Sequence, residues 1–252
     1  MIFTVAQHII SRTSRPVSTF TMGSSIRLTD FTIPADPPDT DFQRNAVADL
    51  LGRQSKQFPG AQPVSFARHH LKELREVDYF MCEKTDGIRC LLYLTQHIDP
   101  GGEMVEAQYL IDRKNDYYYI RRDELHIPRQ VGDMQSFHTG TLLDGELVRQ
   151  RDKSAPYNER ITYLIFDCLA TDGESIMNRD FAKRLARVDS RIVQPIKAFK
   201  RMYPGDVAAQ PFQIEMKKME LPYGFVMMFD HVSVSRRGMP GGACVDGSLM
   251  EV

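Results

Sequence analysis

One lysine in the chain stands where it could act as a nucleophile. Lys84 directly follows the apolar run 79–82 and precedes Asp86-Gly87, a dipeptide typical of tight turns. An ordinary β-hairpin would have the same pattern. A lysine held at the end of a buried strand is partly desolvated, however, which lowers the pKa of its amine and supplies a neutral nucleophile. The segment therefore predicts that Lys84 is catalytic.

Two carboxylates follow in the run 141–148. In a β-strand the side chains of Asp144 and Glu146 would point to one side, and those of the flanking leucines to the other. Two solvent-facing acids on an edge strand are the simpler interpretation. Beside bound phosphate groups, such carboxylates would instead hold a divalent cation, which prefers hard oxygen ligands.

A third apolar run, residues 163–170, carries a single acid near its end. This acid, Asp167, precedes Thr171-Asp172-Gly173, whose residue types are common in turns. An acid at the end of a strand often caps such a turn. That interpretation stays open for Asp167 when the residues are considered alone.

Helical spacing of apolar residues predicts the helices around these segments. One short helix is expected over residues 41–53. A second is expected to start at Ser65 and to bury Leu71 and Leu74. A third, amphipathic helix is expected between residues 181 and 192, where apolar residues recur at helical spacing after Asn178 as a cap.

Runs of alternating or continuous apolar residues predict the strands that must position the candidate side chains. They cover residues 79–83, 88–94, 109–112, 117–120, 141–148, 161–169 and 212–217. The runs 109–112 and 117–120 flank a short polar turn, which indicates a hairpin. Antiparallel-looking strands with few helices indicate an α+β fold.

Composition excludes several classes of protein. The chain has 252 residues, of which 42% are hydrophobic, enough for one large domain or two small ones. Its 32 Lys and Arg offset 33 Asp and Glu, which excludes a strongly basic protein that coats nucleic acid by bulk charge. It contains no run of ~18 apolar residues, so a membrane-spanning helix is not expected. The four cysteines form no CxxC pair, which argues against a zinc site and favours a reducing compartment.

Both ends of the chain differ in composition from the centre. Residues 1–29 contain arginines, Ser and Thr but no acid, as in a mitochondrial transit peptide. An upstream extension of a protein that starts at Met22 is the favoured interpretation. Residues 232–252 show no periodicity. We therefore expect a leader or mis-annotated extension over 1–33, a folded domain over 34–231 and an atypical tail over 232–252.

Four segments in order resemble the motifs of the covalent nucleotidyltransferases, which include DNA ligases, RNA ligases and mRNA capping enzymes. The segments are EKTDGIR (83–89), LIDRKNDYYYI (110–120), TLLDGELV (141–148) and YLIFDCLA (163–170). With PFQIEMKKMELPYGF (211–225), the chain looks most similar to fungal mRNA guanylyltransferases, from about residue 34 to 231. The resemblance implies an antiparallel-sheet nucleotidyltransferase domain, ATP-grasp-like, of α+β class.

The resemblance also implies a reaction and its residues. Lys84 would attack the α-phosphate of GTP, expel pyrophosphate and pass GMP to the diphosphate 5′ end of RNA as an mRNA cap. Nucleotide contacts would come from Glu83, Thr85, Asp86, Arg89, Arg113, Glu146 and Phe166, with Lys217 and Lys218 along the cleft. Mg²⁺ or Mn²⁺ would be held by Glu146 and Asp167. An RNA 5′-triphosphatase subunit and the C-terminal tail of RNA polymerase II are the implied partners, and the nucleus is the implied location.

The family pattern stops at about residue 231. The DGLIF-type segment, the strand with two lysines and the C-terminal OB-fold domain are not found. Val232-Ser233 is the dipeptide that a typical intron start encodes in frame, so the tail resembles a translated intron. We therefore expect an incomplete form with low activity. Two alternatives remain open from the sequence: an ATP-dependent polynucleotide ligase, and a non-catalytic fragment that binds capping partners.

Overall fold

The computed structural model describes residues 2–5, 26–65, 67–151 and 159–221. Residues 6–25 and 222–252, which hold most of the expected leader and all of the expected tail, lie outside the described residues. The chain divides into two compact units. The described part of the smaller unit contains residues 2–5, 65, 67–84 and 218–221, and the larger unit contains the rest. One boundary between the two units falls between Lys84 and Thr85.

The smaller unit pairs two strands in parallel. They are β1 (Ile2–Val5) and β3 (Phe80–Glu83). Met81 also exchanges backbone hydrogen bonds with Glu220, at N–O distances of 2.7 and 2.9 Å. The helix of this unit, α2 (His70–Glu76), begins at His70 instead of Ser65.

The prediction that α2 buries two leucines is wrong. Leu71 and Leu74 are 49% and 37% exposed, and no residue of this helix is buried. Helical spacing over so short a segment therefore indicated a helix without identifying a core.

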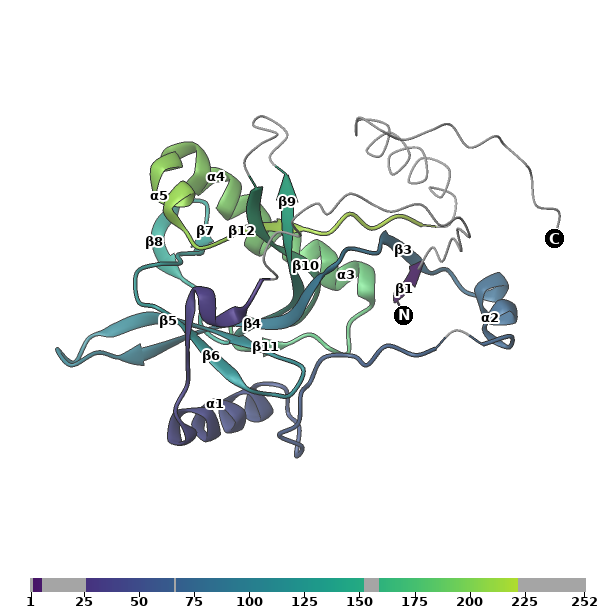
Figure 1. The fold of residues 1–252 in the computed structure, drawn as a ribbon, viewed down its shortest axis with the longest axis horizontal. Coiled ribbons are helices and arrows are strands. Elements are labelled where there is room, and N and C mark those ends of the chain that lie inside the picture. Colours follow the sequence, from purple (N-terminus) through teal and green to yellow (C-terminus); the bar gives the residue numbers. More distant parts are fainter. Residues whose placement is uncertain (1, 6–25, 66, 152–158, 222–252) are drawn as a thin grey trace, which may run out of the picture. The chain divides into compact units, whose positions relative to one another are not determined.

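An eight-stranded sheet forms the centre of the larger unit (Figure 1). In spatial order its strands are β11 (Glu174–Ser175), β10 (Glu159–Thr171), β9 (Thr141–Arg151), β4 (Gly87–Ile98), β5 (Met104–Ile111), β6 (Tyr117–Ile120) and β2 (Thr32–Pro34). The eighth strand, β12 (Gln213–Met216), pairs in parallel with β10, whereas the other neighbours are antiparallel. A separate hairpin joins β7 (Pro128–Gln130) to β8 (Asp133–Phe137).

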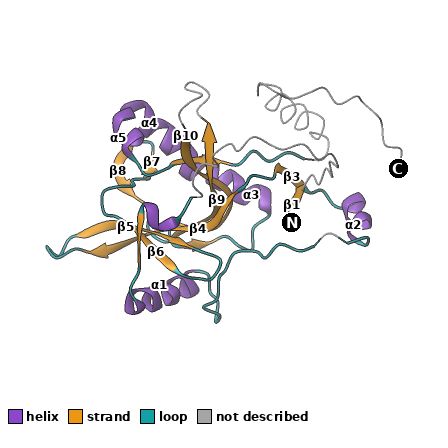
Figure 2. Cartoon of the chain, in the orientation of Figure 1, coloured by secondary structure: helices purple, strands orange, loops and turns teal. Residues whose placement is uncertain are grey.

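Helices of the larger unit cover the two faces of this sheet (Figure 2). They are the 3₁₀ turn η1 (Leu28–Asp30), α1 (Pro37–Leu50), α3 (Phe181–Val188), the π-helical turn η2 (Asp189–Val193), α4 (Gln194–Met202) and α5 (Pro204–Ala209). The expected cap Asn178 is not the cap: Asp180 precedes the first turn of α3. No helix within the described ranges has both the length and the apolar character that a membrane crossing requires.

Alternation along β4 builds a core on both faces of the sheet. Leu92 and Leu94 join the cluster that contains Val188 of α3, whereas Leu91 and Tyr93 join the one that contains Val47 of α1. Strands that are buried on both faces have continuous apolar sequences. This burial explains why the run in β4 lacks the polar alternation of a half-exposed strand.

A β-bulge at Phe166 changes which side chains of β10 face the core. Ile165 lies opposite Gly145, and Asp167 lies opposite Asp144, so Phe166 is the extra residue. Bulges are common next to active sites because they redirect side chains. After the bulge, Cys168 faces the core cluster that Ile165 faced before it.

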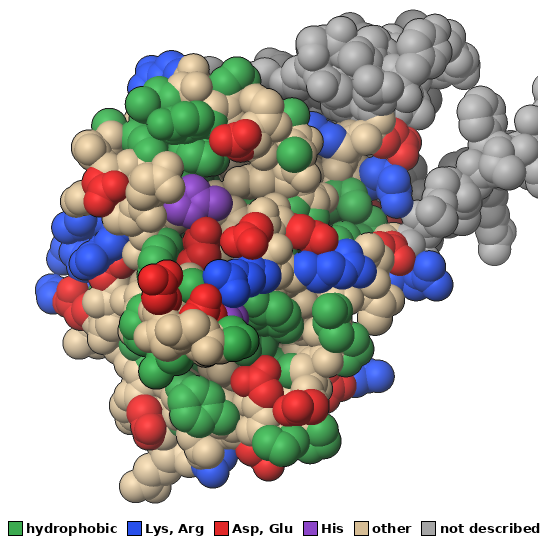
Figure 3. Space-filling view, turned by 90° about the vertical axis from the view of Figure 1, so that its left-hand side faces the viewer, with side chains coloured by type: hydrophobic (Ala, Val, Ile, Leu, Met, Phe, Trp, Pro, Cys, Tyr) green, Lys and Arg blue, Asp and Glu red, His purple; other side chains and the backbone are tan. Residues whose placement is uncertain are grey.

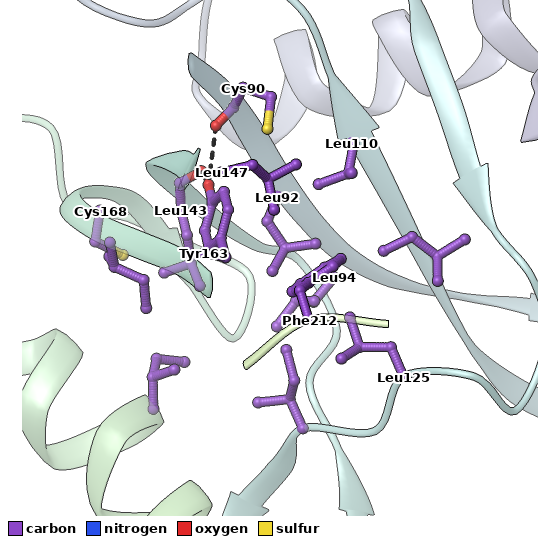
Figure 4. Packing of buried hydrophobic residues seen from close by; sticks show 14 of the residues in the cluster. Cys90, Leu92, Leu94, Leu110, Leu125, Leu143, Leu147, Tyr163, Cys168 and Phe212 are labelled. Carbon is purple, nitrogen blue, oxygen red and sulfur yellow. Dashed lines mark hydrogen bonds between the residues drawn. The ribbon is translucent and has the colours of Figure 1, made fainter. Parts of the chain in front are cut away.

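Tyr163 crosses the sheet interior and needs a glycine opposite. Its hydroxyl, fully buried, lies 2.9 Å from the Cys90 carbonyl and 3.1 Å from that of Leu143 (Figure 4). A methyl group on Gly145 would stand 2.5 Å from the Tyr163 ring. This distance is much shorter than a van der Waals contact, so the Tyr163 ring fills the space that a side chain at position 145 would need.

We expect Gly145→Ala to destabilise the larger unit. The added methyl must displace Tyr163, and overpacking of a core commonly costs about 1–3 kcal/mol. Urea unfolding followed by far-UV circular dichroism measures the change. Gly132→Ala is the matched control, because no atom lies within 4 Å of a Cβ built at Gly132. Equal stability of the two variants would contradict the close approach.

The ring of His126 is placed to donate two hydrogen bonds, because both of its nitrogens face oxygen acceptors. Nδ1 lies 2.8 Å from Glu106 Oε1 and Nε2 lies 2.8 Å from the Met134 carbonyl. Only an imidazolium donates from both nitrogens. Burial opposes this charge, but the hydrogen bond and attraction of Glu106 and the Met134 carbonyl together raise the pKa of His126.

We expect this histidine to make stability depend on pH. Because the pKa of His126 is raised in the folded state, its contribution to the free energy of unfolding is complete below about pH 6.5. This contribution is lost as pH rises through the higher pKa of the folded state. Each unit by which the pKa of the folded state exceeds that of the unfolded state contributes about 1.4 kcal/mol to the free energy of unfolding. Unfolding free energies measured between pH 6 and 8 should fall with pH more steeply for the wild type than for His126→Gln. The control His97→Gln should keep the slope of the wild type. An unchanged slope in His126→Gln would refute the assignment.

Acidic and basic side chains are interspersed on the face of the molecule shown in Figure 3. No area of a single charge dominates that face. This pattern agrees with the nearly balanced charge of the sequence.

Candidate active site

Lys84 lies in an extended connection, not in a hairpin. The strands on either side of it do not pair with each other: β3 pairs with β1, and β4 pairs with β5 and β9. The hairpin interpretation is therefore wrong, because β3 and β4 do not pair with each other. Lys84 is exposed, as are Glu83 and Asp86, so the expected desolvation of Lys84 at the strand end is not found.

Thr85, the residue after Lys84, joins two charged side chains of the larger unit. Lys217 Nζ donates to Thr85 Oγ1 at 2.8 Å and to Glu146 Oε2 at 3.3 Å. Thr85 Oγ1 in turn donates to Glu146 Oε2. The side chains of Lys217 and Glu146 are only 8% and 13% exposed, so this ion pair lies in a region of low dielectric constant.

Glu146 retains one oxygen for a ligand. Within the described part of the chain, its side chain bonds only to Thr85 and Lys217, both through Oε2. Oε1 can therefore accept a hydrogen bond from a hydroxyl group. Because Thr85 is covalently joined to Lys84, the chain itself attaches the candidate nucleophile to this cluster.

Arg89 forms a bidentate ion pair with Asp144 on the neighbouring strand. Its Nε and Nη2 lie 3.1 and 2.6 Å from the two carboxylate oxygens. Asp144 is 2% exposed and lies on β9 between β4 and β10, so the interpretation of two solvent-facing acids on an edge strand is wrong. Burial raises the pKa of Asp144 to about 6, although Arg89 opposes that rise. Asp144 is therefore ionised at neutral pH.

Two aromatic rings lie beside the Arg89 guanidinium. Its central carbon is 5.4 Å from the centre of the Phe166 ring and 5.7 Å from that of Phe58. These distances fall within the range of cation–π attraction. The bulge in β10 thus directs Phe166 toward the expected nucleotide contact Arg89.

Asp167 pairs with an arginine of helix α3. Arg184 Nε and Nη2 lie 2.7 and 2.9 Å from its two carboxylate oxygens, and the backbone N–H of Cys168 donates to the first of them at 2.7 Å. A carboxylate with both oxygens engaged in this way joins α3 to the sheet. The pairing favours a structural role for Asp167 over the expected metal contact.

The described residues do not form a metal site by themselves. No group of three or more His, Cys, Asp or Glu side chains with the spacing of metal ligands occurs among them. Three acids of this region already have a cationic partner: Asp144 has Arg89, Glu146 has Lys217 and Asp167 has Arg184.

The remaining expected contacts take no part in these pairs within the described ranges. Arg113 is exposed in the turn between β5 and β6 and has no hydrogen bond or ion pair to another expected site residue of the described ranges. Lys218 belongs to the smaller unit, where it pairs with Glu220 at 3.0 Å. The structure therefore groups Thr85, Glu146 and Lys217 in one cluster and Arg89 with Phe166 in another.

Sequence reasoning missed Phe58 and Arg184 as neighbours of the site. Phe58 precedes Pro59-Gly60, whose residue types indicate a break in regular structure. Arg184 lies at the border of the apolar face of α3, next to Val188 in helical projection. Neither carries a signal of its own, because both act through a partner that is distant in the sequence.

Comparison with known proteins identifies the family. Residues 27–238 match the family model of the mRNA capping enzyme, catalytic domain. The mRNA-capping enzyme subunit alpha of Neurospora crassa is 47% identical over 190 residues, which are 75% of this chain and 46% of that protein. The same subunit of Schizosaccharomyces pombe is 40% identical over 194 residues, and that of Saccharomyces cerevisiae 37% over 187.

The match covers only part of these relatives. The chain spans about half the length of the curated relatives it matches, 46% and 47% for the first two. The family model covers most of the present chain, however, including every expected site residue from Glu83 to Lys218. The chain thus belongs to the mRNA capping enzyme family, by its match to the catalytic domain of that family.

Proposed function

We propose that this chain carries out guanylyl transfer for mRNA capping. In the first step the Lys84 amine, after losing a proton, attacks the α-phosphate of GTP. A nitrogen–phosphorus bond forms, the bond from the α-phosphate to the bridging oxygen breaks, and pyrophosphate leaves. In the second step the diphosphate end of an RNA displaces Lys84 and receives GMP.

The cluster of Thr85, Glu146 and Lys217 is the observation that carries this proposal. It joins the residue next to Lys84 to a buried cation and to a carboxylate with one open oxygen. A buried ammonium group stabilises negative charge on phosphate oxygens, and a carboxylate accepts hydrogen bonds from ribose hydroxyls. The catalytic domain match supports the same chemistry.

Other elements of the proposal follow from the family. Mg²⁺ or Mn²⁺ would neutralise charge on the GTP phosphates, and the proposal assigns it no protein ligands. An RNA 5′-triphosphatase subunit and the tail of RNA polymerase II would be partners, and the nucleus the place of action. ATP-dependent ligation receives no support from the relatives, which are capping enzymes.

Labelling with nucleotide tests the proposal. The purified chain is incubated with GTP or ATP that carries label in the α-phosphate, and the protein is then separated under denaturing conditions. We expect label on the protein from GTP and not from ATP, and release of the label by acid, as for a phosphoamide. Labelling by ATP alone, or by neither nucleotide, would overturn the proposal.

A further inference from the structure

We propose that residues 56–61, named here the brace, hold Arg89 and the turn of Arg113 in position for the nucleotide. The part that concerns nucleotide rests on the proposed function. The brace is a loop of the larger unit that follows α1. It contacts β4 at one end and the β5–β6 turn at the other.

At its C-terminal end the brace binds Arg89. The Arg89 Nη1 donates to the Ala61 carbonyl at 2.6 Å, while Nε and Nη2 bind Asp144. A guanidinium has five N–H groups, so these bonds leave two for a ligand. The carbonyl of Ala61 thus fixes the one part of the guanidinium that Asp144 does not hold.

At its N-terminal end the brace binds the β5–β6 turn. Asn115 Nδ2 donates to the Lys56 carbonyl at 2.8 Å. Asn115 has a φ of 69°, and its backbone N–H donates to the Asp112 carbonyl at 2.9 Å, which closes the turn that contains Arg113. One short segment therefore contacts both Arg89 on β4 and the β5–β6 turn that contains Arg113.

Gly60 is required where the brace approaches Arg89. A methyl group at Gly60 would stand 2.4 Å from the Phe58 ring and 2.9 Å from Arg89 Nη2. Gly60 is buried, and Arg89 is tied to the buried Asp144, so neither neighbour can yield without breaking a contact. The constraint is one of space, because the φ of Gly60 is not positive. Gly60 and Phe58 are thus positioning residues that act through Arg89.

Small displacements of such a group have large effects on reactivity. A shift of about 1 Å in a catalytic arrangement can lower the rate by about 10²-fold. Gly60→Ala should therefore slow formation of the GMP adduct by up to about 10²-fold. Gly132→Ala, with open space around its Cβ, is the control and should react like the wild type.

A second variant disturbs the other end of the brace without steric strain. Asn115→Gly keeps the positive φ that glycine accepts readily and removes only the amide that binds Lys56. We expect slower adduct formation with unchanged thermal unfolding. A purely structural role would lower the melting temperature and leave the rate of the folded protein unchanged.

The decisive experiment follows the Arg89 side chain directly and then its coupling to the reaction. In nitrogen-15 NMR spectra the Arg89 Nε–H signal, assigned by its loss in Arg89→Lys, should exchange slowly with water in the wild type and much faster in Gly60→Ala. In the Arg89→Lys background, Gly60→Ala should slow adduct formation no further. Unchanged Arg89 exchange in Gly60→Ala overturns the brace, whether or not GTP reacts. If exchange is altered in Gly60→Ala but the wild type forms no GMP adduct, the contact between the brace and Arg89 is confirmed. The role of that contact toward nucleotide is then overturned, along with the proposed function.

Discussion

Replacing Lys84 with arginine should abolish the covalent GMP adduct. Arginine keeps the positive charge and nearly the length of lysine, but its guanidinium stays protonated at any usable pH and offers no neutral amine. We expect the rate of adduct formation to fall by at least about 10³-fold, since loss of a covalent nucleophile commonly costs more than that. Labelling with α-labelled GTP measures the effect.

The exposure of Lys84 makes a conservative change at this position readily interpretable. The residue is exposed, so Lys84→Arg should leave the unfolding temperature unchanged. Lys72→Arg is a matched control on the same unit, where Lys72 is also exposed and pairs with Glu76 at 3.8 Å. An adduct that persists in Lys84→Arg would show that another residue is the nucleophile.

Arg89→Met should be the most destabilising of the changes considered. It leaves the carboxylate of Asp144, 2% exposed, without its bidentate partner. Removing one member of a buried ion pair commonly costs about 3–5 kcal/mol, because the remaining charge is buried without compensation. Urea unfolding of the variant at pH 8 measures this loss.

The pH dependence distinguishes an unpaired charge from simple loss of packing. Burial already raises the pKa of Asp144 to about 6 with Arg89 present, and its removal raises that pKa further. A carboxylate with a raised pKa costs stability as pH rises through that value, so the deficit of Arg89→Met should be smaller at pH 5 than at pH 8. The double variant Arg89→Met, Asp144→Leu should recover most of the stability. Equal deficits at both pH values, with no recovery, would indicate lost packing alone.

Local patterns were enough to predict most strands of the larger unit. Apolar runs predicted β4, β6, β9 and β10 near their observed positions, because strands buried on both faces need continuous apolar side chains. Alternation also placed Asp144 and Glu146 together on the face opposite Leu143 and Leu147, which belong to one core cluster. The runs did not show which strands pair. The turn signal of Asp86-Gly87 suggested a hairpin, but β3 pairs with β1, and β4 pairs with β5 and β9.

The partners of the charged residues could not be predicted from local sequence. Asp144 and Asp167 were expected as exposed or metal-related acids, yet Arg89 and Arg184, at separations of 55 and 17 residues, hold them. The bulge at Phe166 has no signal in the sequence, because it arises from register with β9. Resemblance to a family supplied the reaction, and the fold supplied the contacts around it.

Mapping the modified residue tests the central claim most directly. The chain is incubated with GTP, digested under non-acidic conditions and analysed by tandem mass spectrometry. The account predicts one GMP-bearing peptide, with the modification on Lys84. A GMP group on any other residue, or a modified Lys84 that carries AMP after incubation with both nucleotides, would contradict it.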